Sequence, residues 1–382
     1  MTHATAPCPS PLPATWSAAG RTAFEIGWDH ARHRLLPPAD HLHAGNPVRQ
    51  GWEAGQAVFG TRTRQPTPQL RKWLQLRLGA WVRGKAFDLV GVTPAFLRRI
   101  EVPLCPITGE ALTHGTSSGS DASIDRVNHR AGYAVGNLAV MSARANRAKS
   151  DCDWRDAARF ARQIEQGRLG SIDGLNARQW ARLSVLTSYC TPLPHADAAA
   201  LPLLVLPPPR LRVLNPVQVL QLMLTLRFMR QGQPARVDRV AALFPPALRT
   251  PVLVLMTSLL ARRIAAGPSW SPALVQRAME DAWADPAILR RWQALAGALT
   301  VAQCERLVER LHAHRLAHPG WRCLPLDAAT EGWALETGGL APQSDEADAR
   351  SWPVGLPVGA GMQAAFGLAK GRSAGAAAAL AA

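Results

Sequence analysis

Two side chains that offer oxygen ligands, Asp125 and Asn146, lie in a segment whose pattern predicts two strands and a short helix. Asp125 lies in a β-prone run, and Leu138–Met141 is a second apolar strand. Between them, His129–Gly132 is expected to form a tight turn, and Ala143–Ser150 favours a helix. Such a unit can point a carboxylate from a strand at an amide from a helix. Two oxygen ligands suit a hard cation such as Mg²⁺, which keeps several of its waters.

The segment that contains these residues resembles a known family, the HNH endonucleases, also called His-Me finger or ββα-metal nucleases. The motifs that carry the resemblance are Cys-Pro-Ile-Thr-Gly at 105–109, Ser-Ile-Asp-Arg-Val-Asn at 123–128, Gly132-Tyr133, Asn137-Leu138, Asn146 and Lys149. It is closest to the phage-type variant, in which Arg follows the metal-binding Asp. The resemblance spans residues 105–150 of a chain of 382.

The resemblance implies hydrolysis of phosphodiester bonds with Mg²⁺ or another divalent cation. By that resemblance, Asp125 and Asn146 are the metal ligands, Asn137 braces the loop and Lys149 follows the helix ligand. Without any site, Asp125 would be a turn-capping carboxylate, Asn137 an ordinary turn residue and Asn146 an exposed helix residue.

Two departures from the family pattern matter. Many members hold this unit with two Cys-x-x-Cys pairs on zinc, whereas here the four positions are Cys105, Thr108, Ser142 and Ala145. One cysteine of four cannot bind structural zinc, so none is expected, and packing against flanking helices must hold the hairpin instead.

The second departure concerns the general base, because Arg126 stands where the common family form has a His. Arginine stays protonated and is a poor base, although it could neutralise a scissile phosphate. His129 is the first candidate for a replacement base and His114 the second. Two alternatives remain: the metal activates water unaided, or the unit only binds.

The charge of the chain favours a polyanionic partner, namely DNA or else RNA. It has 43 Lys+Arg against 27 Asp+Glu, a net charge of +16. A GC-rich genome would explain arginine in place of lysine, but it would not explain the net charge. The candidate contacts lie on the short helix and on an arginine stripe predicted over Trp154–Gln166, although a charged stripe is usually just a solvated face. These contacts are Arg144, Arg147, Arg155, Arg159 and Arg162.

The fold class expected is mainly α, a helical protein with one embedded ββα-metal hairpin–helix module. No run of about 20 apolar residues occurs and the six cysteines are dispersed, so a cytoplasmic protein without membrane spans is expected. The expected organisation is a disordered leader at 1–20, a helical hairpin at 21–64, the nuclease-like module with basic helices at 65–170, a helical domain at 171–337 and a flexible tail at 338–382.

Three functions follow from these observations. The first is a divalent-metal-dependent HNH-type endonuclease acting on DNA. The second is a non-catalytic nucleic-acid-binding protein that keeps the hairpin as an inert scaffold, which the missing His after Asp125 favours. The third is a ribosome-associated factor, because the Gly27-Trp28 and Gly51-Trp52 steps resemble the helical hairpin of ribosome modulation factors.

Overall fold

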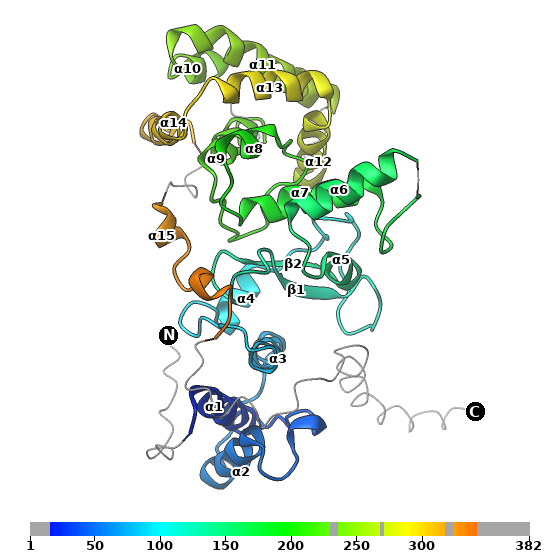
Figure 1. The fold of residues 1–382 in the computed structure, drawn as a ribbon, viewed down its shortest axis with the longest axis vertical. Helices are drawn as coiled ribbons and strands as arrows, with labels where there is room; N and C mark the ends of the chain where they lie inside the picture. The colour runs from blue at the N-terminus through cyan, green and yellow to red at the C-terminus, as the bar shows by residue number, and fades with distance from the viewer. Residues whose placement is uncertain (1–15, 168, 230–235, 268–270, 318–323, 342–382) are drawn as a thin grey trace, which may run out of the picture. The chain divides into compact units, whose positions relative to one another are not determined.

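The computed structural model of the chain describes residues 16–167, 169–229, 236–267, 271–317 and 324–341 (Figure 1). These residues are mainly helical, which confirms the expected fold class at that level, and their strands form one two-stranded sheet. The leader at 1–15 and the tail from 342 onward lie outside the described residues. Within the described ranges, no helix has both the length and the apolar character needed to cross a bilayer.

The elements follow in chain order. They are α1 (Ala18–Arg32), η1 (Ala39–His41), α2 (Pro47–Phe59), α3 (Pro68–Val82), α4 (Pro94–Arg99), β1 (Ala122–Arg126), β2 (Leu138–Ser142), α5 (Ala143–Lys149), α6 (Trp154–Glu165), α7 (Ala177–Tyr189), α8 (His195–Ala200), α9 (Pro216–Leu226), α10 (Val237–Ala241), α11 (Pro246–Ala265), α12 (Pro272–Trp283), α13 (Pro286–Gly297), α14 (Val301–Ala313), α15 (Leu326–Ala329) and η2 (Leu335–Thr337).

Polar caps followed by proline fix where several helices begin. The Thr67 hydroxyl accepts a hydrogen bond from the Leu70 amide at 3.1 Å, and the Thr93 hydroxyl accepts one from the Phe96 amide at 3.2 Å. Each threonine precedes a proline, whose missing N–H costs nothing in the first helical turn. The sequence therefore specifies the starts of α3 and α4 locally.

The chain divides into two compact units. Among the described residues, unit 1 comprises the chain up to Arg83 and the segment Thr113–Asp121, and unit 2 comprises Gly84–Leu112 and Ala122–Ala341. This division differs from the expected boundaries near 64 and 170. The hairpin is not a domain apart from the later helices, because Met141 of β2 and Leu186 of α7 belong to the same buried core.

Glycines on α1 and α2 let these two helices pack closely in unit 1. A Cβ on Gly27 would lie 1.8 Å from the Val48 carbonyl oxygen, and one on Gly51 would lie 1.9 Å from the Phe24 carbonyl oxygen. Both glycines of the two Gly-Trp steps therefore serve close helix packing. Arg77 of α3 joins the pair through an ion pair with Glu25 at 2.9 Å.

The core of unit 2 is built around large aromatic side chains. Trp180, Trp283, Trp292 and Trp333 are all fully buried, and Trp283 and Trp292 meet edge to face at 5.9 Å. Burying side chains of this size is worth several kcal/mol each (roughly 25 cal/mol per Å² of apolar surface). The core supplies the rigid support behind β2, all of whose residues are buried.

Part of the expected flexible tail is ordered. The Gly339 carbonyl accepts a hydrogen bond from the Ala86 amide at 3.0 Å, and the Ala341 amide donates to the Gly84 carbonyl at 2.9 Å. Residues 338–341 thus belong to unit 2, because their backbone pairs with residues 84–86.

Candidate metal and phosphate site

The hairpin and the helix after it are present in unit 2. Strands β1 and β2 are antiparallel, with Asp125 opposite Ala139, and α5 starts at the residue after β2. The side chain of Ser142 caps α5 by accepting a hydrogen bond from the Ala145 amide at 3.3 Å. The order strand, strand, helix over 122–149 therefore agrees with the sequence prediction for this segment.

The connection between the strands contains a turn close to the expected one, because the Ala131 amide donates to the Asn128 carbonyl at 3.2 Å. It runs over residues 127–137, and the glycine with positive φ is Gly136, at 91°. Gly132 does not have a positive φ. It is needed for close approach instead, since a Cβ there would lie 2.8 Å from the Ala86 carbonyl oxygen.

Asn146 lies against β1 on the same side as Asp125. Its amide nitrogen donates to the Ser123 hydroxyl at 2.7 Å, and Ser123 and Asp125 are two residues apart on the strand, so their side chains share a face. Ser123 was not singled out from the sequence, although the two-residue period of a strand could have indicated it. The carboxylate and the amide thus come to one face of the hairpin–helix unit.

Lys149 occupies this face with them. Its ammonium nitrogen lies 2.8 Å from Asp125 Oδ2 and donates a hydrogen bond to the Arg126 carbonyl at 2.9 Å. The Lys149 side chain is 1% exposed and that of Asp125 is 13% exposed. Among the described residues, no group donates a well-directed hydrogen bond to Asp125 Oδ2, so this oxygen is held by charge.

Asn137 is fully buried and binds only the connection. Its carbonyl oxygen accepts from the Asn128 amide at 2.8 Å, and its nitrogen donates to the carbonyls of Asn128 and Gly132 at 3.1 and 3.0 Å. Asn128 in turn donates to the Cys190 carbonyl of α7's C-cap at 2.9 Å. These bonds are those of a brace that fixes the connection on the core.

The guanidinium of Arg126 is also used within the connection. It donates to the carbonyls of His129 and Ala131 at 3.1 and 3.0 Å and lies 5.0 Å from the centre of the Tyr133 ring. A phosphate would have to share this guanidinium with the two carbonyls, which leaves three of its five N–H donors for other partners.

The two candidate bases are in different surroundings. His129 is half-buried, and burial lowers its pKa below the ordinary 6.5; the positive charges of Lys149 and Arg130 lower it further, while Asp151 opposes them. The imidazole is therefore neutral at pH 7, as a base must be. His114 is exposed and belongs to unit 1, so it is not placed relative to Asp125.

The four positions that carry zinc ligands in many HNH nucleases form a hydrogen-bonded turn here. The Cys105 sulfur accepts from the amides of Thr108 and Ser142 at 3.4 and 3.3 Å, and it is buried. Gly109, at φ 75°, closes the turn with a bond from its amide to the Cys105 carbonyl at 2.9 Å. A thiol and backbone amides thus join the 105–109 turn to the start of α5.

Trp333 is a residue of this region that the sequence did not indicate. Its indole nitrogen donates to the Val135 carbonyl at 2.9 Å, and its own carbonyl accepts from the Gly132 amide at 2.7 Å. The side chain is fully buried. No local signal could have revealed this contact, because 198 residues separate Trp333 from Val135.

The five arginines proposed for nucleic-acid contact fall into two groups. Three form ion pairs: Arg144 with Glu110 at 3.2 Å, Arg155 with Asp197 at 3.2 Å and Arg159 with Asp156 at 2.8 Å. The other two, Arg147 and Arg162, are exposed. Exposed ion pairs are worth little and exchange readily with other anions.

The residues on the shared face offer few ligands to a divalent cation. Across the described ranges, no three His, Cys, Asp or Glu side chains gather as a metal-binding group. The ligands available are the Asp125 carboxylate, whose Oδ2 lacks hydrogen-bond donors, and the Asn146 amide oxygen. One carboxylate and one amide match a cation that keeps most of its waters, as Mg²⁺ does. Lys149 would compete with it for Asp125.

Comparisons of this chain with known protein families, with curated proteins and with solved structures find no match.

Proposed function

We propose that the chain is a divalent-metal-dependent endonuclease that hydrolyses phosphodiester bonds in DNA, through an HNH-like site at residues 105–150. The observation that carries the proposal is the shared face of Asp125, Asn146 and Lys149 on a hairpin–helix unit. The net charge of +16 supports a polyanionic substrate.

In this proposal each side chain has a stated task. Asp125 and Asn146 would hold the cation, which would supply charge neutralisation and Lewis acidity at the phosphate. Lys149 sets the position of the Asp125 carboxylate, and neutral His129 takes a proton from the attacking water. Arg126 uses its remaining donors on the phosphate.

A non-catalytic nucleic-acid-binding protein is the second candidate. Two observations favour it: the ammonium of Lys149 already neutralises Asp125, and the Arg126 guanidinium already binds two carbonyls of the connection. Such a protein would bind nucleic acid through the exposed arginines, and no catalysis would take place at Asp125.

Incubation of the purified protein with supercoiled plasmid and Mg²⁺ or Mn²⁺ tests the proposal. Wild-type protein should nick the plasmid, and Asp125→Ala should abolish nicking, because a single neutral amide cannot hold a strongly hydrated dication. Asn146→Ala should weaken it, with partial rescue at higher metal. Asp238→Ala, an exposed carboxylate on α10, is the matched control and should keep full activity.

Two outcomes would decide against the enzyme. Absence of cleavage of DNA and RNA with every divalent ion, together with retained DNA binding, supports the binding protein. Equal cleavage by wild type and Asp125→Ala would show that the activity comes from elsewhere or from a contaminant.

A further inference from the structure

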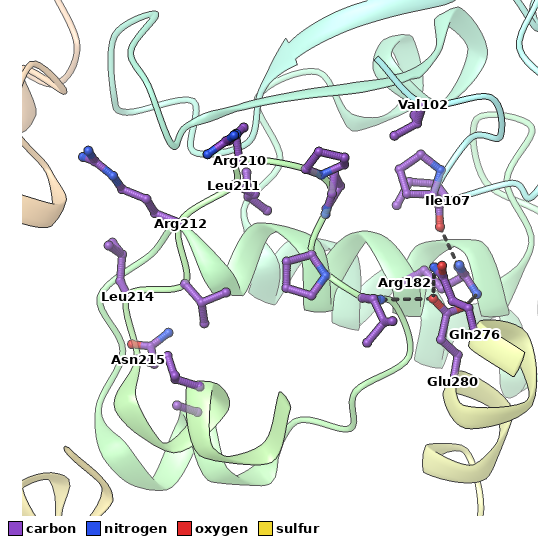
Figure 2. A pocket seen from close by; sticks show the side chains of 18 of the residues that line it. Val102, Ile107, Arg182, Arg210, Leu211, Arg212, Leu214, Asn215, Gln276 and Glu280 are labelled. Atoms are coloured by element: carbon purple, nitrogen blue, oxygen red, sulfur yellow. Dashed lines mark hydrogen bonds and ion pairs between the residues drawn. The ribbon is translucent and has the colours of Figure 1, made fainter. Parts of the chain in front are cut away.

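A pocket of about 1690 Å³ lies within unit 2, apart from the Asp125 face (Figure 2). Its walls come from residues 102–109, 206–217 and 324–329 and from α7 and α12. These segments are far apart in the sequence, so the pocket is a product of the tertiary fold.

The charged residues inside the pocket are satisfied by one another. Arg182 and Glu280 form an ion pair at 2.9 Å, and their side chains are 12% and 3% exposed. Glu280 also accepts from the Leu206 amide and the Gln276 side chain, and Arg182 donates to the Pro106 carbonyl, as the dashed lines around Arg182 in Figure 2 illustrate. This network holds the walls together and uses the charges of Arg182 and Glu280 within the pocket.

The remaining lining includes several large apolar side chains that are exposed. Large apolar side chains from four separate segments are about half exposed there. They are Leu104 (44%), Leu274 (57%), Val301 (43%), Leu324 (53%) and Leu326 (50%). Three consecutive prolines, Pro207–Pro209, continue the same surface. Large apolar side chains that gather on one exposed surface are typical of binding grooves.

The edge of the pocket is positively charged. Arg178, Arg210 and Arg277 line it and are exposed, and they outnumber the one exposed carboxylate of the lining, Glu305. Arg178 forms an ion pair with Asp281, while Arg277 and Arg210 form no ion pair with any residue in the described ranges. An occupant with an apolar stretch beside an acidic stretch would therefore complement the pocket.

The chain itself contains such a segment after its last described residue, Ala341. Asp345, Glu346 and Asp348 are followed by Trp-Pro-Val-Gly-Leu-Pro-Val at 352–358. We propose that residues 345–358 dock in this pocket, with the acidic residues at the arginines and the apolar residues on the exposed leucines. Prolines favour an extended conformation, a form in which peptides commonly enter apolar grooves.

The docking segment is joined to the unit that contains the pocket by only a few residues. Ala341 belongs to the same unit as the pocket, and an extended chain spans roughly 3.3–3.6 Å per residue, which gives about 36–40 Å from Ala341 to Trp352. A tethered segment is present at an effective concentration in the millimolar range, so a weak contact is enough to populate the docked state. This inference does not depend on the proposed nuclease activity.

Limited trypsin digestion of the full-length protein tests the proposal, because the tail carries its own internal control. Arg350 lies within the docking segment, whereas Lys370 and Arg372 lie beyond it. Cleavage after Arg350, followed by mass spectrometry, should be slow relative to cleavage after the other two. The double variant Leu274→Asp/Leu326→Asp should accelerate it at least about fivefold, with the rates at Lys370 and Arg372 unchanged.

Two further variants separate docking from unfolding. Leu89→Asp changes a leucine of unit 2 that is 45% exposed and does not line the pocket, and it should leave Arg350 protected. Trp352→Ser/Leu356→Ser changes the tail alone and should expose Arg350 as the pocket variant does. The proposal is overturned if Arg350 is cut equally fast in wild type and pocket variant. It is also overturned if protection depends on protein concentration, which would assign the occupant to a second copy.

Discussion

The ammonium of Lys149 lies 2.8 Å from Asp125 Oδ2, and the lysine is 1% exposed. The two residues come from α5 and β1, so the ion pair ties the helix to the strand that carries the proposed metal ligand. A charge buried in this way is costly unless its partner is present. Lys149 is therefore the charge partner that offsets the cost of placing the Asp125 carboxylate at this position.

Removing Lys149 alone should be more damaging than removing both charges. Lys149→Met is expected to cost about 3–5 kcal/mol of unfolding free energy, because it strands the Asp125 carboxylate. Lys149→Met/Asp125→Asn should recover a large part of that loss, and saturating Mg²⁺ should stabilise Lys149→Met more than wild type. Urea unfolding of the four proteins of this double-mutant cycle measures both effects. Arg147 is exposed on the same helix, so the control Arg147→Met should cost little free energy of unfolding. If the losses of Lys149→Met and Asp125→Asn simply add in the double variant, the two residues are not coupled.

The lowered pKa of His129 predicts the acid side of the pH–rate profile. A base works when neutral, and burial together with Lys149 and Arg130 favours the neutral imidazole, so activity should persist below pH 6.5 and fall only at lower pH. His129→Ala should reduce cleavage by about 10²–10⁴-fold and remove that acid limb. Nicking rates from pH 4.5 to 8 provide the measurement. A loss below about threefold would assign the base role to His114 or to metal-bound hydroxide.

The arginine stripe on α6 should set part of the salt dependence of DNA binding. Arg155→Ala/Arg159→Ala/Arg162→Ala should reduce the slope of log K against log salt, by up to about one for each phosphate that is no longer neutralised. Arg162→Ala should contribute most, because Arg155 and Arg159 also bind Asp197 and Asp156. Fluorescence anisotropy at several salt concentrations gives the slopes. Arg306→Ala on α14 is the control and should leave the slope unchanged. If the triple variant has the same slope as this control, the stripe does not contact DNA and is only a solvated face.

Close helix packing in unit 1 predicts a large cost for a single methyl group. Gly51→Ala places a Cβ 1.9 Å from the Phe24 carbonyl oxygen, a backbone atom that cannot rotate away, so a loss of about 3 kcal/mol or more is expected. Gly20→Ala on α1 is the matched control, since its Cβ would meet only ordinary contacts from 3.4 Å outward, and it should be neutral or slightly stabilising because alanine favours the helix. Thermal denaturation distinguishes them. Similar melting temperatures would mean that α1 and α2 separate at little cost.

Local signals in the sequence were enough to predict the elements of the candidate site. Strand periodicity predicted β1 and β2, and the alanine- and arginine-rich run predicted α5. The turn near His129 was predicted to within one residue, since the Ala131 amide donates to the Asn128 carbonyl. The rest of the 127–137 connection could not be predicted, because distant residues shape it: Asn128 binds the Cys190 carbonyl, and Trp333 binds the Val135 carbonyl. Local pattern carries no information on contacts of that separation.

The same limit applies to the domain boundaries and to the arginines. The hairpin shares its core with α7, which depends on packing rather than on composition. Partners such as Asp197 for Arg155 lie 42 residues away and become visible only in the fold.

The bonds between Trp333 and the 127–137 connection have a consequence for synthesis of the protein. A ribosome must add 198 residues after Val135 before Trp333 exists to bind it. At about 5–20 residues per second, that interval is roughly 10–40 s. During this time the connection that carries His129 lacks two of its backbone restraints, so the emerging chain passes through a period in which the hairpin has been translated but its loop has not been fixed.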